Sequence, residues 1–173
     1  RIATAVVRLQ VDVAFGDAIT PGTSEVEFPA LLDFPAPRLR VYPRETVVAE
    51  KLEATVKLGL ANSRMKDFHD LAVLSRLFAF DGPLLVRAIR ATFERRGTPL
   101  PGSPPVAFTP EFTEDREKRA QWAGFVRKAG AKDAGDLAST MAVVARFGGK
   151  PLEVAASGEA WSGQWPASGP WEP

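Results

Sequence analysis

The sequence predicts an α+β fold in which short strands come first and helices follow. Two observations support this prediction. Residues 4–13 alternate between apolar and polar side chains, which is typical of a half-buried strand. From Arg44 onward, apolar residues instead recur every three or four positions, which is typical of helices with one buried face. With 173 residues, of which 45% are apolar and 25% charged, the chain is long enough to form one packed domain.

The composition excludes several classes of protein. There is no cysteine, so disulfides and thiolate metal sites are excluded and the expected compartment is the cytoplasm. No apolar run reaches the roughly 18 residues of a membrane-spanning helix, and a membrane partner is not expected. The net charge of +1 provides no general attraction to nucleic acid, so any such affinity needs a local patch. The chain starts inside the alternating pattern without an initiator methionine, and we expect it to be a fragment of a longer protein.

The elements are expected in this order. The strand over residues 4–13 ends in the turn residues Phe15-Gly16-Asp17, and two short strands follow at 26–28 and 39–42. Prolines on both sides confine these two strands to the edge of a sheet or to short pairings. Ser63 is the expected N-cap of the second helix. The predicted helices cover residues 44–57, 63–78, 84–96, 114–128 and 136–147.

The organisation follows from these elements. Residues 1–96 are expected to form the first part, with strands before helices. Residues 97–110 are rich in Pro, Gly and Ser and are interpreted as a linker. Residues 111–147 would form a helical region. Residues 148–173, which hold three of the four tryptophans, are expected to form an extended tail.

Asp12 is the first candidate for chemistry. It lies between Val11 and Val13, so in a strand its side chain projects opposite to theirs. If that face lines a cleft, a strand is a rigid position for a carboxylate that holds Mg²⁺, since hard cations prefer oxygen ligands. The alternative is a polar residue on the solvent-facing side of a half-buried strand.

Lys51 is the second candidate. It lies in the helix predicted over 44–57, at the border of the apolar stripe that contains Val48 and Leu52. A lysine there can extend its charge to a phosphate, or it can reach solvent along its aliphatic stem.

The segment Ser63–Leu71, SRMKDFHDL, holds two bases, two acids and the only histidine. On a helix, Asp67 and Asp70 fall on one face, three positions apart. Opposite-charge pairs and the helix dipole can explain every charge in this segment. Two acids crowded on one face would also suit a site that binds a metal and a triphosphate. His69 is expected to point away from both acids, as a surface or packing residue.

Two segments together resemble a known family. Residues 41–54, VYPRETVVAEKLEA, precede residues 63–74, SRMKDFHDLAVL, with 16 positions between Lys51 and Asp67. They are similar to the segments x-Y-P-x-E-x-x-x-A-E-K-L and R-x-K-D-x-x-D-L of the AbiEii/AbiGii nucleotidyltransferase toxins, which come from abortive-infection and type IV toxin–antitoxin systems. The resemblance covers residues 9–97, and the later residues match only loosely.

The resemblance implies a fold and an activity. The fold would be the remnant of a nucleotidyltransferase-type mixed sheet packed by helices, followed by a mainly helical C-terminal region. The activity would be transfer of a nucleotide from a nucleoside triphosphate to RNA, with Mg²⁺ as cofactor. In characterised relatives the acceptor is the 3′ end of tRNA, where added nucleotides block translation during phage defence. A cognate antitoxin is the implied protein partner.

The resemblance also implies roles for particular residues. Asp12 would be the third acid of the family's carboxylate set and a metal ligand, and Asp67 the essential acid of the second helix. Lys51 would contact the triphosphate. Arg64 and Lys66 would help to bind the nucleotide, and Glu50 and Asp70 would support the site.

One element of the family pattern is missing. Enzymes of this class hold metal and triphosphate with a Gly-Gly or Gly-Ser turn followed by an Asp-x-Asp strand, and the 173 residues contain no such element. In the family it precedes the strand that would carry Asp12. We therefore expect the fragment alone to be inactive and the longer protein to be an enzyme.

Two other functions stay open from the residues themselves. The chain could be a non-catalytic interaction module, with the charged helix start as a solvated cap and the Trp-rich tail as the docking surface. A metal-dependent nuclease built on Asp12, Glu50 and Lys51 is less well supported, because the usual acid-x-lysine spacing is absent.

Overall fold

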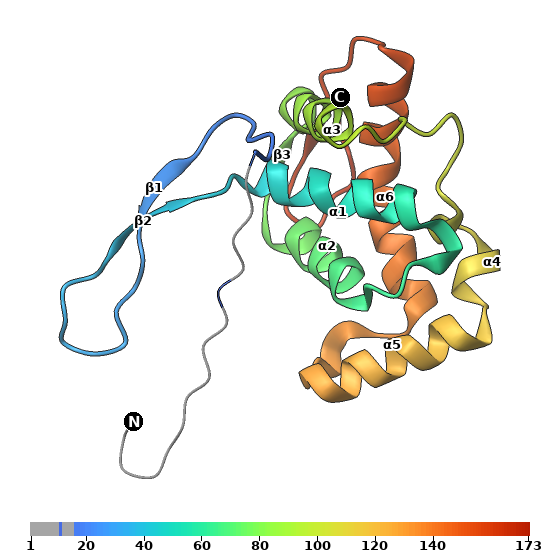
Figure 1. The fold of residues 1–173 in the computed structure, drawn as a ribbon, viewed down its shortest axis with the longest axis horizontal. Helices are drawn as coiled ribbons and strands as arrows, with labels where there is room; N and C mark the ends of the chain where they lie inside the picture. The colour runs from blue at the N-terminus through green and yellow to red at the C-terminus, as the bar shows by residue number, and fades with distance from the viewer. Residues whose placement is uncertain (1–10, 12–15) are drawn as a thin grey trace.

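The computed structural model describes residue 11 and residues 16–173. In that part of the chain a two-stranded hairpin precedes a body of helices (Figure 1), which confirms the α+β class. The predicted strand over residues 4–13 lies outside the described residues. The strands are β1 (Ser24–Glu27), β2 (Arg38–Val41), β3 (Phe80–Asp81) and β4 (Gln164–Trp165). The helices are α1 (Arg44–Leu58), α2 (Met65–Leu77), α3 (Gly82–Arg96), α4 (Pro110–Thr113), α5 (Arg116–Ala129) and α6 (Leu137–Ser157).

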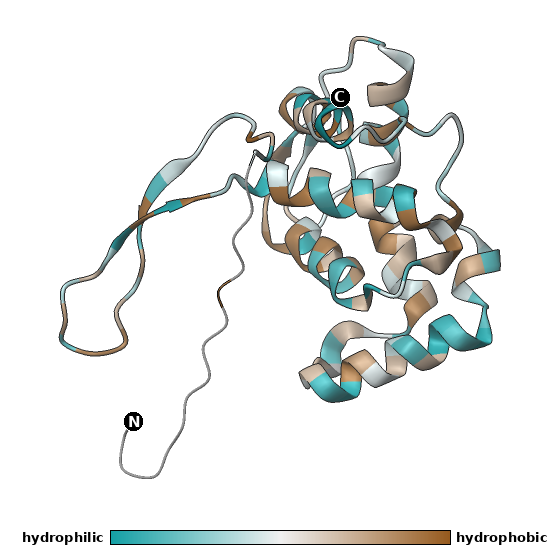
Figure 2. Cartoon of the chain, in the orientation of Figure 1, coloured by the Kyte–Doolittle hydropathy of each residue, from teal (hydrophilic) through white to brown (hydrophobic). Residues whose placement is uncertain are grey.

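The β1–β2 hairpin projects from the helical body (Figure 1). The strands are antiparallel, with Val26 opposite Leu39, and they confirm the two short strands predicted here. Because side chains alternate along a strand, Val26 and Leu39 share one face and Glu25 and Arg40 share the other. The apolar residues of the hairpin and its loop are exposed, and Figure 2 shows them as brown segments of the ribbon.

One hydrophobic core joins the helices. Helix α1 packs against α3, and α6 packs against both α2 and α3. Leu52 of α1, Phe68 of α2, Ile89 of α3 and Phe147 of α6 are all fully buried in this core. The three helices predicted after Pro43 are thereby confirmed within a few residues at each end.

The N-terminus of α2 differs in one detail from the prediction. Helix α2 begins at Met65, and its N-cap position is Arg64 rather than Ser63. The side-chain oxygen of the buried Asn62 accepts a hydrogen bond from the backbone N–H of Arg64 at 2.8 Å. Asn62 therefore satisfies a backbone donor at this helix start, and the Ser63 hydroxyl is not needed as a cap.

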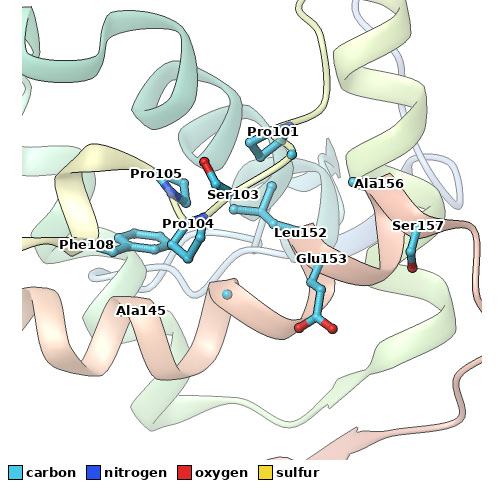
Figure 3. Close-up of a pocket in the computed structure, with 12 residues that line it drawn as sticks. Pro101, Ser103, Pro104, Pro105, Phe108, Ala145, Leu152, Glu153, Ala156 and Ser157 are labelled. Atoms are coloured by element: carbon cyan, nitrogen blue, oxygen red, sulfur yellow. The ribbon is translucent and has the colours of Figure 1, made fainter.

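Residues 97–110 pack against the body instead of separating two cores. Pro105 and Ala107 are buried, and the core is continuous from α1 to Trp165 across this segment. Between the proline-rich part of the segment and α6 lies a groove of 680 Å³ (Figure 3). Its walls include Pro104 and Phe108 on one side and Leu152 on the other.

Helix α6 is longer than predicted. The sequence suggested an end at Phe147 and an extended tail from Gly148, but residues 148–157 are helical, so that prediction is wrong there. Pro151 has no N–H to donate to the carbonyl of Phe147 four positions earlier. The indole N–H of Trp171 donates to that carbonyl at 2.8 Å, which replaces the missing bond. The helix can thus continue through a proline.

Gly148 has a packing role in the same helix. A Cβ at this position would lie 2.7 Å from Cδ2 of the buried Leu52, closer than real Cβ contacts come. The absence of a side chain at Gly148 therefore leaves room for Leu52 of α1 to pack against α6.

The end of the chain folds back onto the helices. Strand β4 pairs with β3, with Trp165 opposite Phe80. Trp165 is 1% exposed, and its indole N–H donates to the carbonyl of Ser75 at 2.7 Å. The ring of Trp171 stacks on Phe147. The tryptophan-rich tail is therefore part of the core, not a free segment.

Candidate functional site

Helices α1 and α2 bring the charged residues of the two family-like segments together. The ammonium nitrogen of Lys51 lies 2.6 Å from Oδ1 of Asp67 and 2.8 Å from Oδ2 of Asp70. The side chains of Lys51 and Asp67 are 16% and 9% exposed, so this contact is largely shielded from water. The geometry follows from packing, because Leu52 and Phe68 bury the apolar faces of the two helices and turn these neighbouring residues toward each other.

Two further cations surround the acids. Nε of Arg64 lies 2.7 Å from Oδ2 of Asp67, and the ammonium of Lys66 lies 2.6 Å from Oδ2 of Asp70. Both cations are exposed, unlike Lys51. Three cations and two carboxylates leave the cluster with one excess positive charge. We call Lys51, Arg64, Lys66, Asp67 and Asp70 the α1–α2 charge cluster.

The two oxygens of the Asp67 carboxylate differ in their hydrogen bonding. Oδ1 accepts the hydrogen bond from Lys51. Oδ2 is buried and accepts no hydrogen bond among the described residues, although Arg64 lies within ion-pair distance. The Arg64 contact therefore lacks hydrogen-bond alignment and counts as an ion pair only. One buried acceptor of the cluster stays available for a better-aligned donor.

The protonation states of the cluster follow from this geometry. Burial works against the charge of Lys51, but its hydrogen bonds to Asp67 and Asp70 outweigh burial and raise the pKa of Lys51. Burial likewise favours the neutral form of Asp70, but hydrogen bonds from Lys51 and Lys66 outweigh it and lower the pKa of Asp70. Both groups are charged at neutral pH.

His69 lies at the edge of the cluster. Its ring packs on Phe125 of α5, with 5.5 Å between ring centres, as expected of a packing residue. Its Nδ1 is nevertheless 3.8 Å from Oδ1 of Asp70, so it does not point away from that acid as the sequence suggested.

Glu50 belongs to a different group of charges. It lies 3.2 Å from Arg96 at the end of α3, and Arg96 also binds Glu53 at 2.9 Å. Successive helical residues point about 100° apart, so Glu50 and Lys51 reach different neighbours. Burial is the main reason that the pKa of Glu50 is raised, and the positive charge of Arg96 opposes it.

Sequence reasoning did not select Arg96, Glu53 or Thr98. Glu53 is 2% exposed and accepts hydrogen bonds from Arg96 and from the hydroxyl of Thr98. The available signal was weak: two acids three positions apart in one helix and an Arg-Arg pair ending another. Opposite charges on separate helices show no pairing until the helices are packed.

Asp12 lies outside the described residues, so the structure leaves its predicted place beside Lys51 and Asp67 untested. Among the residues that are described, no group of three or more carboxylate or histidine side chains could hold a metal ion. Asp67 and Asp70 already bind Lys51. The described residues therefore supply a cluster of cations but do not by themselves form a magnesium site.

The fold and the cluster define a helix pair that presents a half-buried lysine, fixed by two aspartates, beside two exposed cations. Such a site is suited to phosphate groups. A family model described as "Nucleotidyl transferase AbiEii toxin, Type IV TA system" matches residues 2–142, which is well over half of the chain. The chain belongs to this family of nucleotidyltransferase toxins, for which a nucleotide substrate and a cognate antitoxin are implied.

Two other comparisons gave no match, one with curated proteins and one with solved structures. The family match ends at residue 142 inside α6, so residues 143–157 of that helix and the tail lie beyond it. None of the helices in the described part of the chain is long and apolar enough to cross a membrane.

Proposed function

We propose that this chain forms part of a cytoplasmic enzyme that transfers a nucleotide from a nucleoside triphosphate to an RNA acceptor. The acceptor we propose is the 3′ end of tRNA, where added nucleotides stop translation and defend the cell against phage. The observation that supports this proposal best is the position of Lys51. The two family-like segments lie on different helices, and their charged residues meet at this one ammonium group.

In the proposed reaction, a ribose hydroxyl of the RNA attacks the α-phosphorus of the triphosphate. A new P–O bond forms to the RNA, the bond between the α- and β-phosphates breaks, and pyrophosphate leaves with the electron pair. The acceptor hydroxyl releases its proton to water. Negative charge must be neutralised on the phosphates during this step, so well-placed cations lower the barrier.

The cluster residues have distinct proposed roles. Lys51 contacts the triphosphate, and Asp67 holds its side chain in place. Arg64 and Lys66 are exposed and can turn toward the phosphates at little cost. Asp70 keeps Lys51 and Lys66 close together, since one of its oxygens contacts both.

Magnesium is the proposed cofactor, with Asp12 as one ligand. When bound, a divalent cation would neutralise phosphate charge. The described residues do not complete such a site, so its other acids would come from the Asp-x-Asp strand that the family carries.

The test is RNA labelling by the protein expressed from the complete gene, with each radioactive triphosphate in turn. Lys51→Met should lower incorporation strongly. Lys57→Met is the matched control, because Lys57 lies on the same helix but is more exposed, and among the described residues its ion pair is with Glu53, at 3.8 Å. Equal incorporation by the two variants would contradict the role of Lys51. No incorporation by the unaltered protein would contradict the proposed function.

The alternative, a non-catalytic interaction module, receives limited support. The tail that would dock a partner is packed into the core through Trp165. The exposed apolar side chains of the β1–β2 hairpin, among them Phe28, Leu32 and Phe34, are the surface that favours a protein partner. If the chain captures a protein partner and the protein from the complete gene does not label RNA, this alternative is favoured.

A further inference from the structure

Helix α5 concentrates positive charge in a chain that is nearly neutral as a whole. The net charge of the chain is +1, but α5 holds five basic side chains and one acid, Glu117. One of the five, Lys118, is buried and donates to the carbonyl of Asn62 at 3.1 Å. The other four are exposed: Arg116, Arg119, Arg127 and Lys128. The local patch that affinity for nucleic acid would need is therefore present on this helix.

The exposed cations of α5 are not paired with acids in the described part of the chain. None of the four makes an ion pair with a described residue. The two acids that flank Arg116 in the sequence have other partners. The carboxylate of Asp115 accepts from the backbone N–H of Lys118 at 2.8 Å, and that of Glu117 accepts from the side chain of Gln121 at 2.7 Å. The positive charges are therefore available to an anionic ligand.

Three of the arginines share one face of α5. At about 100° per residue, Arg116, Arg119 and Arg127 lie within about 80° of the helix circumference, and they span about 16 Å along its axis. This face points away from the buried residues of the helix. The positions between the arginines on this face are Ala120 and Ala123, so no large side chain separates them. We call these three arginines the α5 arginine face.

Helix α5 packs beside the helix that carries two acids of the α1–α2 charge cluster (Figure 1). Lys118 contacts Asn62, just before α2, and seven positions further along both segments Phe125 packs on His69. The equal spacing means that α2 and α5 run side by side in the same direction for about two turns. Lys66, an exposed cation of the cluster, lies one turn before His69. The two groups of exposed cations therefore lie on neighbouring helices.

We propose that the α5 arginine face is the surface on which the RNA acceptor docks through its phosphate backbone. This inference rests on the proposed function and names the part of the chain that holds the acceptor. An arginine fork can bind a phosphate group through two parallel hydrogen bonds. Contacts of this kind position the RNA but do not read its sequence.

The apolar residues of α5 favour RNA over a lipid surface or a protein partner. None of the large exposed apolar side chains of the described residues lies on α5. A helix that lies in a membrane surface needs an apolar face to insert into lipid. The centre of a protein interface is likewise poor in charged residues and rich in apolar ones. A polyanion bound through its phosphates needs neither.

The test measures the binding of a fluorescently labelled tRNA transcript to the protein from the complete gene, without triphosphate, over a range of salt concentrations. In the triple variant Arg116→Gln, Arg119→Gln, Arg127→Gln we expect the affinity to fall about a hundredfold at about 0.1 M salt. Each lost phosphate contact also removes a salt-dependent term. The slope of log affinity against log salt concentration should therefore become shallower by about two to three.

The matched control removes the same charge from other helices. It replaces three further exposed arginines, which make no ion pair with a described residue, by glutamine: Arg76 of α2, Arg87 of α3 and Arg146 of α6. The control should bind tRNA within about threefold of the unaltered protein and keep its salt slope, because it lacks the docking contacts and not only the charge is compared. Both triple variants should keep a nearly normal melting temperature, since the arginines are exposed.

The kinetics of RNA labelling provide a second readout. The α5 arginine face would touch the RNA backbone and not the reacting atoms. Its triple variant should therefore raise the KM of the tRNA, and it should leave kcat at saturating tRNA and the KM of the triphosphate within about twofold of normal.

The outcomes separate this inference from the proposed function. Equal loss of tRNA binding in the two triple variants, or no tRNA binding by the unaltered protein, would overturn the docking surface. So would unchanged tRNA binding by the α5 variant together with lost binding to phosphatidylserine vesicles, which would assign the face to a membrane. Because binding is measured without triphosphate, the docking surface is decided even if the unaltered protein labels no RNA, a result that would overturn the proposed function.

Discussion

The ammonium group of Lys51 lies 2.6 Å from a carboxylate oxygen of Asp67, sixteen positions later in the chain and on another helix. This contact turns two separate sequence segments into one site. It also explains why two acids crowd one face of α2, since Asp67 and Asp70 bind the same lysine. Ordinary helix stability does not require that arrangement.

Asp67→Asn is predicted to reduce RNA labelling by the protein from the complete gene about a hundredfold, because losing a charge contact in a shielded site costs on the order of 3 kcal/mol in the transition state. Asp115→Asn is the control, since Asp115 is an acid that caps the start of α5. It should lower stability by about 1 kcal/mol or less and leave labelling unchanged. Near-normal labelling by folded Asp67→Asn would show that Asp67 stabilises the start of α2 and has no role in the reaction.

The stability of the chain should fall at acid pH in a way that depends on Asp70. The folded pKa of this carboxyl is lowered, so its contribution is present above the unfolded pKa and is lost as the pH falls below about 4. Urea unfolding between pH 3 and pH 7 should therefore show that the free energy of unfolding falls less at acid pH in Asp70→Asn than in the unaltered chain. Asp33→Asn, an exposed position in the hairpin loop, should keep the normal profile. Identical profiles for the two variants would contradict the coupling to Lys51.

The 173-residue chain alone is predicted to add no nucleotide to RNA with any triphosphate, because it contains no Asp-x-Asp pair to accompany Asp12. The measurement is RNA labelling with and without Mg²⁺. Magnesium-dependent incorporation by this chain would show that the catalytic acids have been assigned to the wrong residues.

Alanine substitutions at two neighbouring glycines of α6 should change the stability of the chain in opposite directions. At Gly148 the added methyl group would press on buried Leu52, which costs about 1–3 kcal/mol and exceeds the gain in helix propensity. At Gly149 nothing lies within 4 Å of the added Cβ, so alanine should stabilise the chain by about 1 kcal/mol. Denaturant unfolding of both variants measures this difference, and equal effects would contradict the close packing of Leu52 on Gly148.

Trp171→Phe should destabilise the chain by about 1–3 kcal/mol, because the Phe147 carbonyl loses its donor. In a Pro151→Ala background the restored N–H can donate to the same carbonyl, so the cost of Trp171→Phe should be smaller. A double-mutant cycle measures the coupling. A coupling energy of zero would show that the two residues act independently.

The sequence predicted the parts of the fold that depend on local patterns. Helices α1 to α3 and the two short strands follow from the spacing of apolar residues and prolines. The family resemblance gave Lys51 and Asp67 roles in one site, but it did not predict that they contact each other. Periodicity describes one segment at a time. It cannot show that the carbonyl left without a donor by Pro151 will accept a hydrogen bond from the indole N–H of Trp171, twenty positions after that proline.

The same limit applies to the site. The resemblance gave Glu50 a supporting role in the site of Lys51, but helix geometry directs the two side chains to different partners. Arg96 was not selected at all, since its contacts join helices that meet only in the packed chain. Ser63 was predicted as the N-cap from its residue type, but Arg64 occupies that position, and its backbone N–H donates to the buried Asn62.

The tryptophans of the docked tail can report on its packing through their fluorescence. Trp161, Trp165 and Trp171 lie edge to face with one another or with Phe147, while Trp122 lies apart on α5. Indole emission shifts to longer wavelength when water reaches the ring. The intrinsic fluorescence of the chain will therefore be dominated by whether the tail is docked, and its release can be followed in real time without any added dye.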